Sequence, residues 1–172
     1  MALKGIEKIN GILNSFLKDF DCSAEVDNDF TYHSDINLIT YSFTCSEISN
    51  VMFSNVISAL CPNIKCDIFL WSLLHELGHH ETIDSISDAD YCFSFDEKLR
   101  IREQLSGVSA ETNEKLYMQI ANDYYFLPDE IAATCWAVDF VTKNQHRVRQ
   151  LWNDLQPAIK EFYTLNEVEL EA

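Results

Sequence analysis

The chain has 172 residues, a length that fits one domain, and its 47% hydrophobic and 23% charged residues are typical of a globular protein. It is acidic, with 28 Asp and Glu against 12 Lys and Arg and a formal net charge of −16. This charge excludes the basic face that direct nucleic-acid binding requires, and no apolar stretch is long enough to span a membrane.

The amino-terminal residues and the cysteines predict a cytoplasmic protein. Residues 1–8 mix charged and apolar side chains and lack the continuous apolar segment of a signal peptide. The six cysteines occur in a chain large enough to bury a core, so we expect free, buried thiols rather than disulfides. Cys61 and Cys66 have no second cysteine pair with which to complete a zinc knuckle.

The first third of the chain predicts one helix and a small antiparallel sheet. Residues 2–19 repeat apolar side chains every three or four positions, as an amphipathic helix does. Residues 21–32 are polar and rich in turn formers, with a short strand at 24–27. Residues 36–43 alternate and contain β-branched and aromatic side chains, which predicts a strand. This strand is either an edge along which a peptide substrate could pair or an interior strand of the sheet.

Two helices are predicted next. Residues 44–47 have the form of a capping box, which starts a helix that runs to about residue 60 and stops before Pro62. Asp67 then caps a helix over residues 68–80. This second helix is apolar on nearly all sides, so we expect it to be central and buried.

The remainder of the chain predicts an acidic loop and then further helices. Residues 82–94 contain several aspartates and are typical of a loop. Pro128 suits the first turn of a helix, whereas we expect Pro157 to break or bend the last helix. The helical patterns cover residues 95–105, 109–122, 128–143 and 145–165. The whole chain, residues 1–172, is therefore predicted to be a single, mostly helical α+β domain.

The segment His75-Glu76-Leu77-Gly78-His79 carries the clearest chemical signal. Its HExxH spacing places both imidazoles on one helix face, so that both can bind one ion. Neutral imidazole suits Zn²⁺, and Glu76 can act as general base toward a water at the ion. Gly78 costs helix stability, which the close approach of another segment would explain. The alternative is a buried helix whose histidines merely pair with carboxylates.

A catalytic zinc site needs a third protein ligand, which we expect from a later helix. Glu130 is the leading candidate because it lies in the first turn of the helix that begins at Pro128. Asp129 and the acidic residues within 84–96 are alternative third ligands. Small side chains let this helix pack closely on the HExxH helix: Ala132, Ala133 and Ala137.

No motif identifies the remaining candidate catalytic residues. A peptidase needs a donor for the oxyanion of its reaction, and Tyr125 and His146 are the leading catalytic candidates, ahead of Tyr124 and Arg149. Each of them has a structural role as its alternative. We expect His80 and Glu81 to lie beside the metal site or at the surface. His80 and Glu81 follow the second histidine of HExxH directly.

These two segments, HExxH and Glu130-x-x-Ala133-x-x-Trp136-Ala137, resemble the ImmA/IrrE-type metallopeptidases. That family consists of minimal gluzincin-like zinc proteases of bacteria, phages and mobile elements, with a downstream pattern close to E-x-E-A-N-x-F-A. The resemblance implies a zincin-like fold with a zinc ion held by His75, His79 and Glu130. The chain departs from the pattern by a longer interval before Glu130 and at three positions: Ala132, Thr134 and Trp136.

The resemblance implies that the chain is a zinc-dependent peptidase, a hydrolase that acts on a protein substrate. The implied substrates are transcriptional repressors of a phage or mobile element, and an acidic enzyme would attract such basic DNA-binding proteins. We expect neither membrane association nor direct nucleic-acid binding. The alternative function is that of a non-catalytic, acidic binding protein with a structural or vestigial zinc site.

Overall fold

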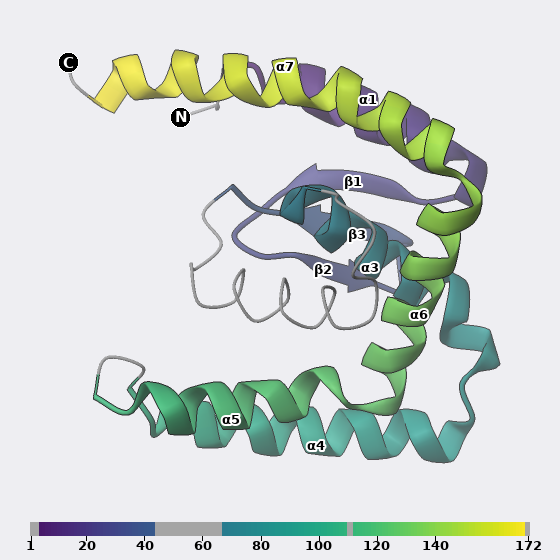
Figure 1. Cartoon of the computed structure of the whole chain (residues 1–172), viewed down its shortest axis with the longest axis vertical. Coiled ribbons are helices and arrows are strands. Elements are labelled where there is room, and N and C mark those ends of the chain that lie inside the picture. The colour runs from purple at the N-terminus through teal and green to yellow at the C-terminus, as the bar shows by residue number, and fades with distance from the viewer. Residues whose placement is uncertain (1–3, 44–66, 110–111, 171–172) are drawn as a thin grey trace. The chain divides into compact units, whose positions relative to one another are not determined.

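The computed structural model describes residues 4–43, 67–109 and 112–170 (Figure 1). The chain divides into two compact units, one formed by Met1–Thr44 with Val141–Ala172 and the other by Cys45–Phe140. Helices predominate, and the strands of the described residues form one small sheet in the N-terminal third. The predicted α+β class is therefore confirmed, whereas the prediction of a single domain over residues 1–172 stays a prediction.

The sheet belongs to the first unit and contains the strands β1 (Ser23–Val26), β2 (Thr31–His33) and β3 (Leu38–Tyr41) in the order β1-β3-β2. β1 runs parallel to β3, and β2 runs antiparallel to it. The sheet is mixed, so the expectation of a purely antiparallel sheet was wrong. β2 lies in a stretch that we expected to be turns. Because β3 lies between the other two strands, the interpretation of this segment as a free edge for a peptide is also wrong.

Helix α1 (Ile6–Leu17) packs against β1 and is followed by a short 3-10 turn, η1 (Lys18–Phe20). Ile9, Leu13 and Leu17 are fully buried, as the periodicity predicts. The side chain of Asn14 pairs with Ala24 in β1 through two hydrogen bonds. Its Nδ2 donates to the Ala24 carbonyl over 3.1 Å, and its Oδ1 accepts from the Ala24 N–H over 2.7 Å.

Helix α7 (Gln145–Leu170) lies beside α1 in the same unit. It continues through Pro157, so of the predicted break or bend the break was wrong, and the bend stays a prediction. Leu155 and Ala158, on either side of the proline, are almost completely buried. Their burial stabilises the helix against the loss of one backbone hydrogen bond at the proline.

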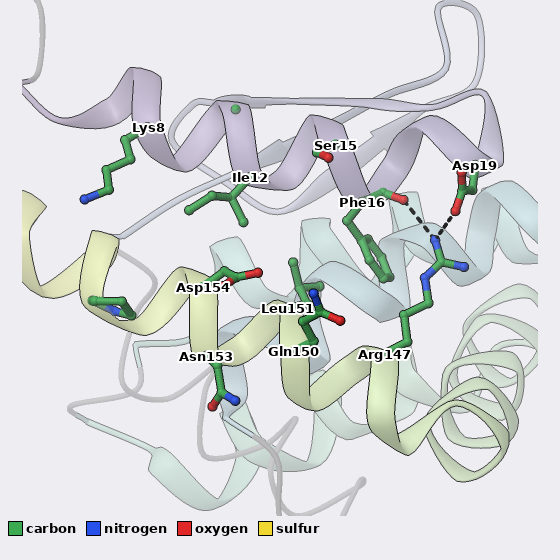
Figure 2. Close-up of a pocket in the computed structure, with 12 residues that line it drawn as sticks. Lys8, Ile12, Ser15, Phe16, Asp19, Arg147, Gln150, Leu151, Asn153 and Asp154 are labelled. Atoms are coloured by element: carbon green, nitrogen blue, oxygen red, sulfur yellow. Dashed lines mark hydrogen bonds and ion pairs between the residues drawn. The ribbon is translucent and has the colours of Figure 1, made fainter.

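A groove runs between α1 and α7 and carries charged side chains of both signs (Figure 2). At one end, Arg147 donates hydrogen bonds to the Phe16 carbonyl over 3.2 Å and to Asp19 Oδ2 over 2.7 Å. Its guanidinium also lies over the rings of Phe16 and Phe20, at 4.7 and 5.1 Å from their centroids. Arg147 therefore fastens this end of α7 to the end of α1.

The second unit begins, in its described part, with α3 (Ile68–Thr82) and a short 3-10 turn, η2 (Ile83–Ser85). The side chain of Asp67 caps α3 by accepting a hydrogen bond from the Phe69 N–H over 2.9 Å, as predicted. Seven of its 15 residues are buried, and Glu81 is the one exposed residue of the helix. The predicted helix from residue 44 to about 60 and the cysteine pair Cys61 and Cys66 lie outside the described residues.

Helix α4 (Asp88–Ser106) occupies half of the predicted loop, so the prediction for residues 88–94 was wrong. Two of the aspartates that suggested a loop, Asp88 and Asp90, lie in its first turn, where carboxylates favour a helix N-terminus, and Ser87 caps the helix. Next come α5 (Glu114–Tyr125), which lies beside α4, and α6 (Pro128–Lys143), which has the predicted bounds (Figure 1).

The described residues include three of the six cysteines. Cys22 is buried, but Cys92 and Cys135 are exposed free thiols, so the expectation of buried thiols was wrong for these two. Within residues 4–43, 67–109 and 112–170, no helix has both the length and the apolar character needed to cross a membrane.

Candidate metal centre

The two histidines of the HExxH segment lie one turn apart on α3. Their ring centroids are 4.8 Å apart, with an angle of 84° between the ring planes. The His75 side chain is buried and the His79 side chain is 16% exposed. The spacing thus brings both imidazoles to one place, with access from one side.

Glu130, in the first turn of α6, meets both histidines. Its Oε2 lies 2.9 Å from Nε2 of His75, and its Oε1 lies 3.4 Å from Nε2 of His79. The three potential ligand atoms all lie within 4.8 Å of one another. Ligands at about 2.0–2.1 Å from a tetrahedral zinc ion lie roughly 3.3 Å apart, so this group can hold a metal ion.

The other residues considered as a third ligand do not join this group. In the described part of the chain, the cluster of His75, His79 and Glu130 is the one arrangement of ligand side chains suited to a metal. Asp129 lies beside it but pairs with a lysine. His80 lies 3.7 Å from Glu81, its neighbour in the chain, and is outside the cluster.

Gly78 brings α3 and α6 into close contact. A Cβ atom at this position would lie 2.3 Å from the carbonyl oxygen of Ala133 and 2.9 Å from its Cα. Both atoms belong to the backbone of α6 and cannot move aside as a flexible side chain would. The glycine therefore permits the helix approach that brings Glu130 to the histidines, and Ala133 and Ala137 are fully buried in this region.

Thr134 contacts the ring nitrogen of His75 that does not face Glu130, and it thereby orients the ring. Its Oγ1 lies 3.0 Å from Nδ1 of His75, and its side chain is 2% exposed. When Nδ1–H donates to this oxygen, Nε2 keeps its lone pair for a metal. In the sequence, Thr134 stands out only as a departure from a family pattern. Its position one turn after Glu130, on the same face of α6, is the signal that identifies its role.

Lys98 of α4 is a cation beside the cluster that no sequence motif revealed. Its Nζ lies 2.6 Å from Oε1 of Glu130 and also pairs with Oδ2 of Asp129. The same ammonium lies 5.2 Å from the centroid of the Tyr124 ring. One helix thus provides the histidines, a second the carboxylate, and a third a lysine whose charge compensates that of the carboxylate.

Burial and charge act in opposite directions on the ionisable groups of the site. Burial by itself raises the pKa of Glu130, but the hydrogen bonds and the charges of His75 and His79 together outweigh it and hold that pKa well below its ordinary value. Burial by itself lowers the pKa of His79, but the hydrogen bond with Glu130 and the negative charges of Glu130 and Glu76 together outweigh it and raise that pKa. Glu130 is therefore an ionised carboxylate, the form that binds a metal.

Glu76 and Tyr124 complete the surroundings of the cluster. The Glu76 carboxylate is half-buried on α3 and acts electrostatically on both His79 and Tyr124. Burial first, and the charge of Glu130 second, raise the pKa of Tyr124, so its hydroxyl keeps its proton at neutral pH. A second carboxylate and a protonated hydroxyl thus interact electrostatically with groups of the cluster.

The structure does not place Tyr125 and His146 in the cluster. Tyr125 is the last residue of α5, and its ring packs edge-on against Tyr124 at 5.7 Å. The Tyr124 ring is the one over which the Lys98 ammonium lies, at 5.2 Å from its centroid. His146 and Arg149 are exposed residues of α7, in the other unit. Sequence spacing alone could not choose between adjacent tyrosines, because that choice depends on how α5 is rotated against α4.

Comparison of the chain with protein-family models, with curated proteins and with solved structures finds no match in any of the three. The likeness to ImmA/IrrE-type peptidases therefore stays an interpretation of two short segments. The geometry that supports a function is that of His75, His79 and Glu130, which can hold a metal ion.

Proposed function

We propose that this protein is a zinc-dependent peptidase of the cytoplasm whose metal ligands are His75, His79 and Glu130. The observation that carries the proposal is the convergence of these three ligand groups from two helices, with a carboxylate next in the chain to the first histidine. Two histidines and one glutamate are a frequent ligand set of catalytic zinc. The exposed free thiols of Cys92 and Cys135 favour a reducing compartment.

A zinc ion bound here would act as a Lewis acid and lower the pKa of a coordinated water to about 7. Glu76 would accept the proton of that water and deliver it to the leaving amine. Thr134 would keep His75 in the tautomer that leaves Nε2 free. Tyr124, whose hydroxyl stays protonated and which interacts electrostatically with Glu130 and Glu76, is the donor that we propose for the developing oxyanion, in preference to Tyr125 and His146.

The substrate that we propose is a basic protein, such as a DNA-binding transcriptional repressor of a phage or mobile element. The net charge of −16 supports this proposal, because it attracts basic proteins and repels nucleic acid. A substrate-trapping experiment addresses this part of the proposal. The Glu76→Gln variant should retain zinc and hold the substrate without cleaving it, so that the substrate co-purifies with the variant but not with the wild-type protein.

A second function has one observation in its favour. Lys98 and the histidines already satisfy the Glu130 carboxylate without a metal, as a structural cluster in a non-catalytic binding protein would. Metal analysis and peptide cleavage together discriminate between the two functions. The peptidase should bind one zinc ion per chain and cleave a quenched peptide library.

Two variants make this experiment decisive. Glu76→Gln should keep the zinc and lose cleavage, because it removes the general base and no ligand. Glu130→Gln should lose both zinc and cleavage. Undiminished cleavage by Glu76→Gln, or cleavage by a wild-type protein from which chelators have removed all metal, would rule out the proposed mechanism.

A further inference from the structure

Lys98 contacts the carboxylate oxygen that faces His79. Its Nζ lies 2.6 Å from Oε1 of Glu130, and Nε2 of His79 lies 3.4 Å from the same oxygen. The Lys98 side chain is 19% exposed, and Glu130 is 2% exposed. An ammonium group and a metal ion bound between the histidines would therefore compete for one buried oxygen, with little water between them to screen their repulsion.

Asp129 offers the ammonium a second position. It precedes Glu130 in α6, is 7% exposed and already pairs with Lys98 through Oδ2. Its other oxygen, Oδ1, is buried and has no hydrogen-bond partner among the described residues. A buried carboxylate oxygen without a hydrogen-bond donor is energetically costly. Oδ1 of Asp129 can therefore accept a further hydrogen bond from the Lys98 ammonium.

We propose that Lys98 is a positioning residue that holds Glu130 while the site lacks a metal and moves onto Asp129 when a metal binds. In the metal-free protein its charge compensates the buried Glu130 carboxylate and keeps the ligand in place. In the metal-bound protein its charge opposes the metal and lowers the affinity. The inference rests on the metal centre of the proposed function but on no step of peptide hydrolysis.

Two substitutions are expected to change zinc affinity in opposite directions. Lys98→Met removes the competing charge and should tighten zinc binding about tenfold, a typical coupling between two interacting sites. It should also lower the melting temperature of the metal-free protein, because the buried carboxylates lose their cation. Asp129→Asn retains Lys98 but weakens its second position, so zinc binding should weaken about tenfold.

Arg100→Met is the matched control. Arg100 lies two residues after Lys98 in the same helix, and it pairs with Glu97 at the exposed surface. Its removal takes the same charge from α4 but leaves the cluster untouched. Zinc affinity, measured by competition with a chromophoric chelator, and the metal-free melting temperature should both stay at the wild-type values.

The measurements separate failure of this inference from failure of the proposed function. Equal or weaker zinc binding by a folded Lys98→Met variant overturns the inference, as does unchanged binding by Asp129→Asn. If Lys98→Met does not fold without zinc, the Asp129→Asn result decides. A wild-type protein that binds zinc but cleaves no peptide overturns only the peptidase, whereas one that binds no zinc overturns both.

Discussion

Two helical glycines have opposite surroundings in the two units. In α1 of the first unit, a Cβ atom added to Gly11 would have no neighbour within 4 Å. In α3 of the second unit, a Cβ atom added to Gly78 would collide with the backbone of α6. The ion pairs of the two units also differ in burial. Lys8 and Glu161 of the first unit pair at the surface, whereas Glu130 of the second unit is buried among its partners. The second unit thus uses close packing to hold polar groups together.

The largest expected effect comes from removing the buried carboxylate. Glu130→Ala leaves the imidazoles and the ammonium of Lys98 without their shared acceptor, so the free energy of unfolding of the metal-free protein should fall by about 3–5 kcal/mol. Glu161→Ala breaks the exposed pair with Lys8 and should cost at most about 1 kcal/mol. Urea denaturation of both variants measures the difference, and equal losses would contradict the contrast between the units.

Gly78→Ala should have the next largest effect. The added methyl group must push α3 and α6 apart, since its nearest neighbours are backbone atoms of Ala133, and such overpacking costs about 1–3 kcal/mol. The shift also moves Glu130 away from the histidines, so zinc affinity should fall. Thermal unfolding and zinc titration of the same preparation test both effects. A variant with unchanged zinc affinity would show that the helix contact does not position the ligand.

Thr134→Val tests the hydrogen bond to His75. Valine has nearly the shape of threonine but offers no acceptor to Nδ1, so zinc affinity should fall about 10- to 100-fold. Thr134→Ser keeps the hydroxyl and should retain most of the affinity. Chelator competition gives both values. Similar losses in the valine and serine variants would point to packing of the methyl group rather than to the hydrogen bond.

Gly11→Ala should produce the smallest change, and in the stabilising direction. Alanine is better than glycine in a helix interior by about 1 kcal/mol, and nothing near Gly11 obstructs its methyl group. The free energy of unfolding should therefore rise, as urea denaturation would show. A destabilised Gly11→Ala protein would mean that the groove between α1 and α7 does not have the room that the structure gives it.

The parts of the site that local sequence determines could be predicted. The HExxH spacing identified both histidines, Asp67 and Pro128 identified the starts of two helices, and Glu130 followed as the leading third ligand from its place in the first turn of α6. The helix starts and the shared face of the histidines follow from the periodicity and end preferences of single helices, whereas the choice of Glu130 also used the need of a catalytic zinc ion for a third protein ligand.

The parts that depend on contacts between distant segments could not be predicted. Lys98 reaches Glu130 from α4, and nothing in its own neighbourhood distinguishes it from Arg100, which faces solvent. The acidic start of α4 was mistaken for a loop because aspartates favour both loops and helix N-termini. The parallel pairing of β1 with β3 likewise depends on the path of the chain between the two strands. The strand propensity of the residues does not determine that path.

The contact between Asn14 and Ala24 has a consequence for how copies of the chain meet. β1 is an outer strand, and an outer strand with unpaired N–H and C=O groups is a template for association with another chain. The Asn14 amide satisfies both backbone groups of Ala24, much as one residue of an adjoining strand would. Asn14→Ala leaves these two groups without their partner, so that β1 can pair with a strand of another copy. The sedimentation coefficient of this variant should therefore increase with protein concentration, whereas that of the wild-type protein should not.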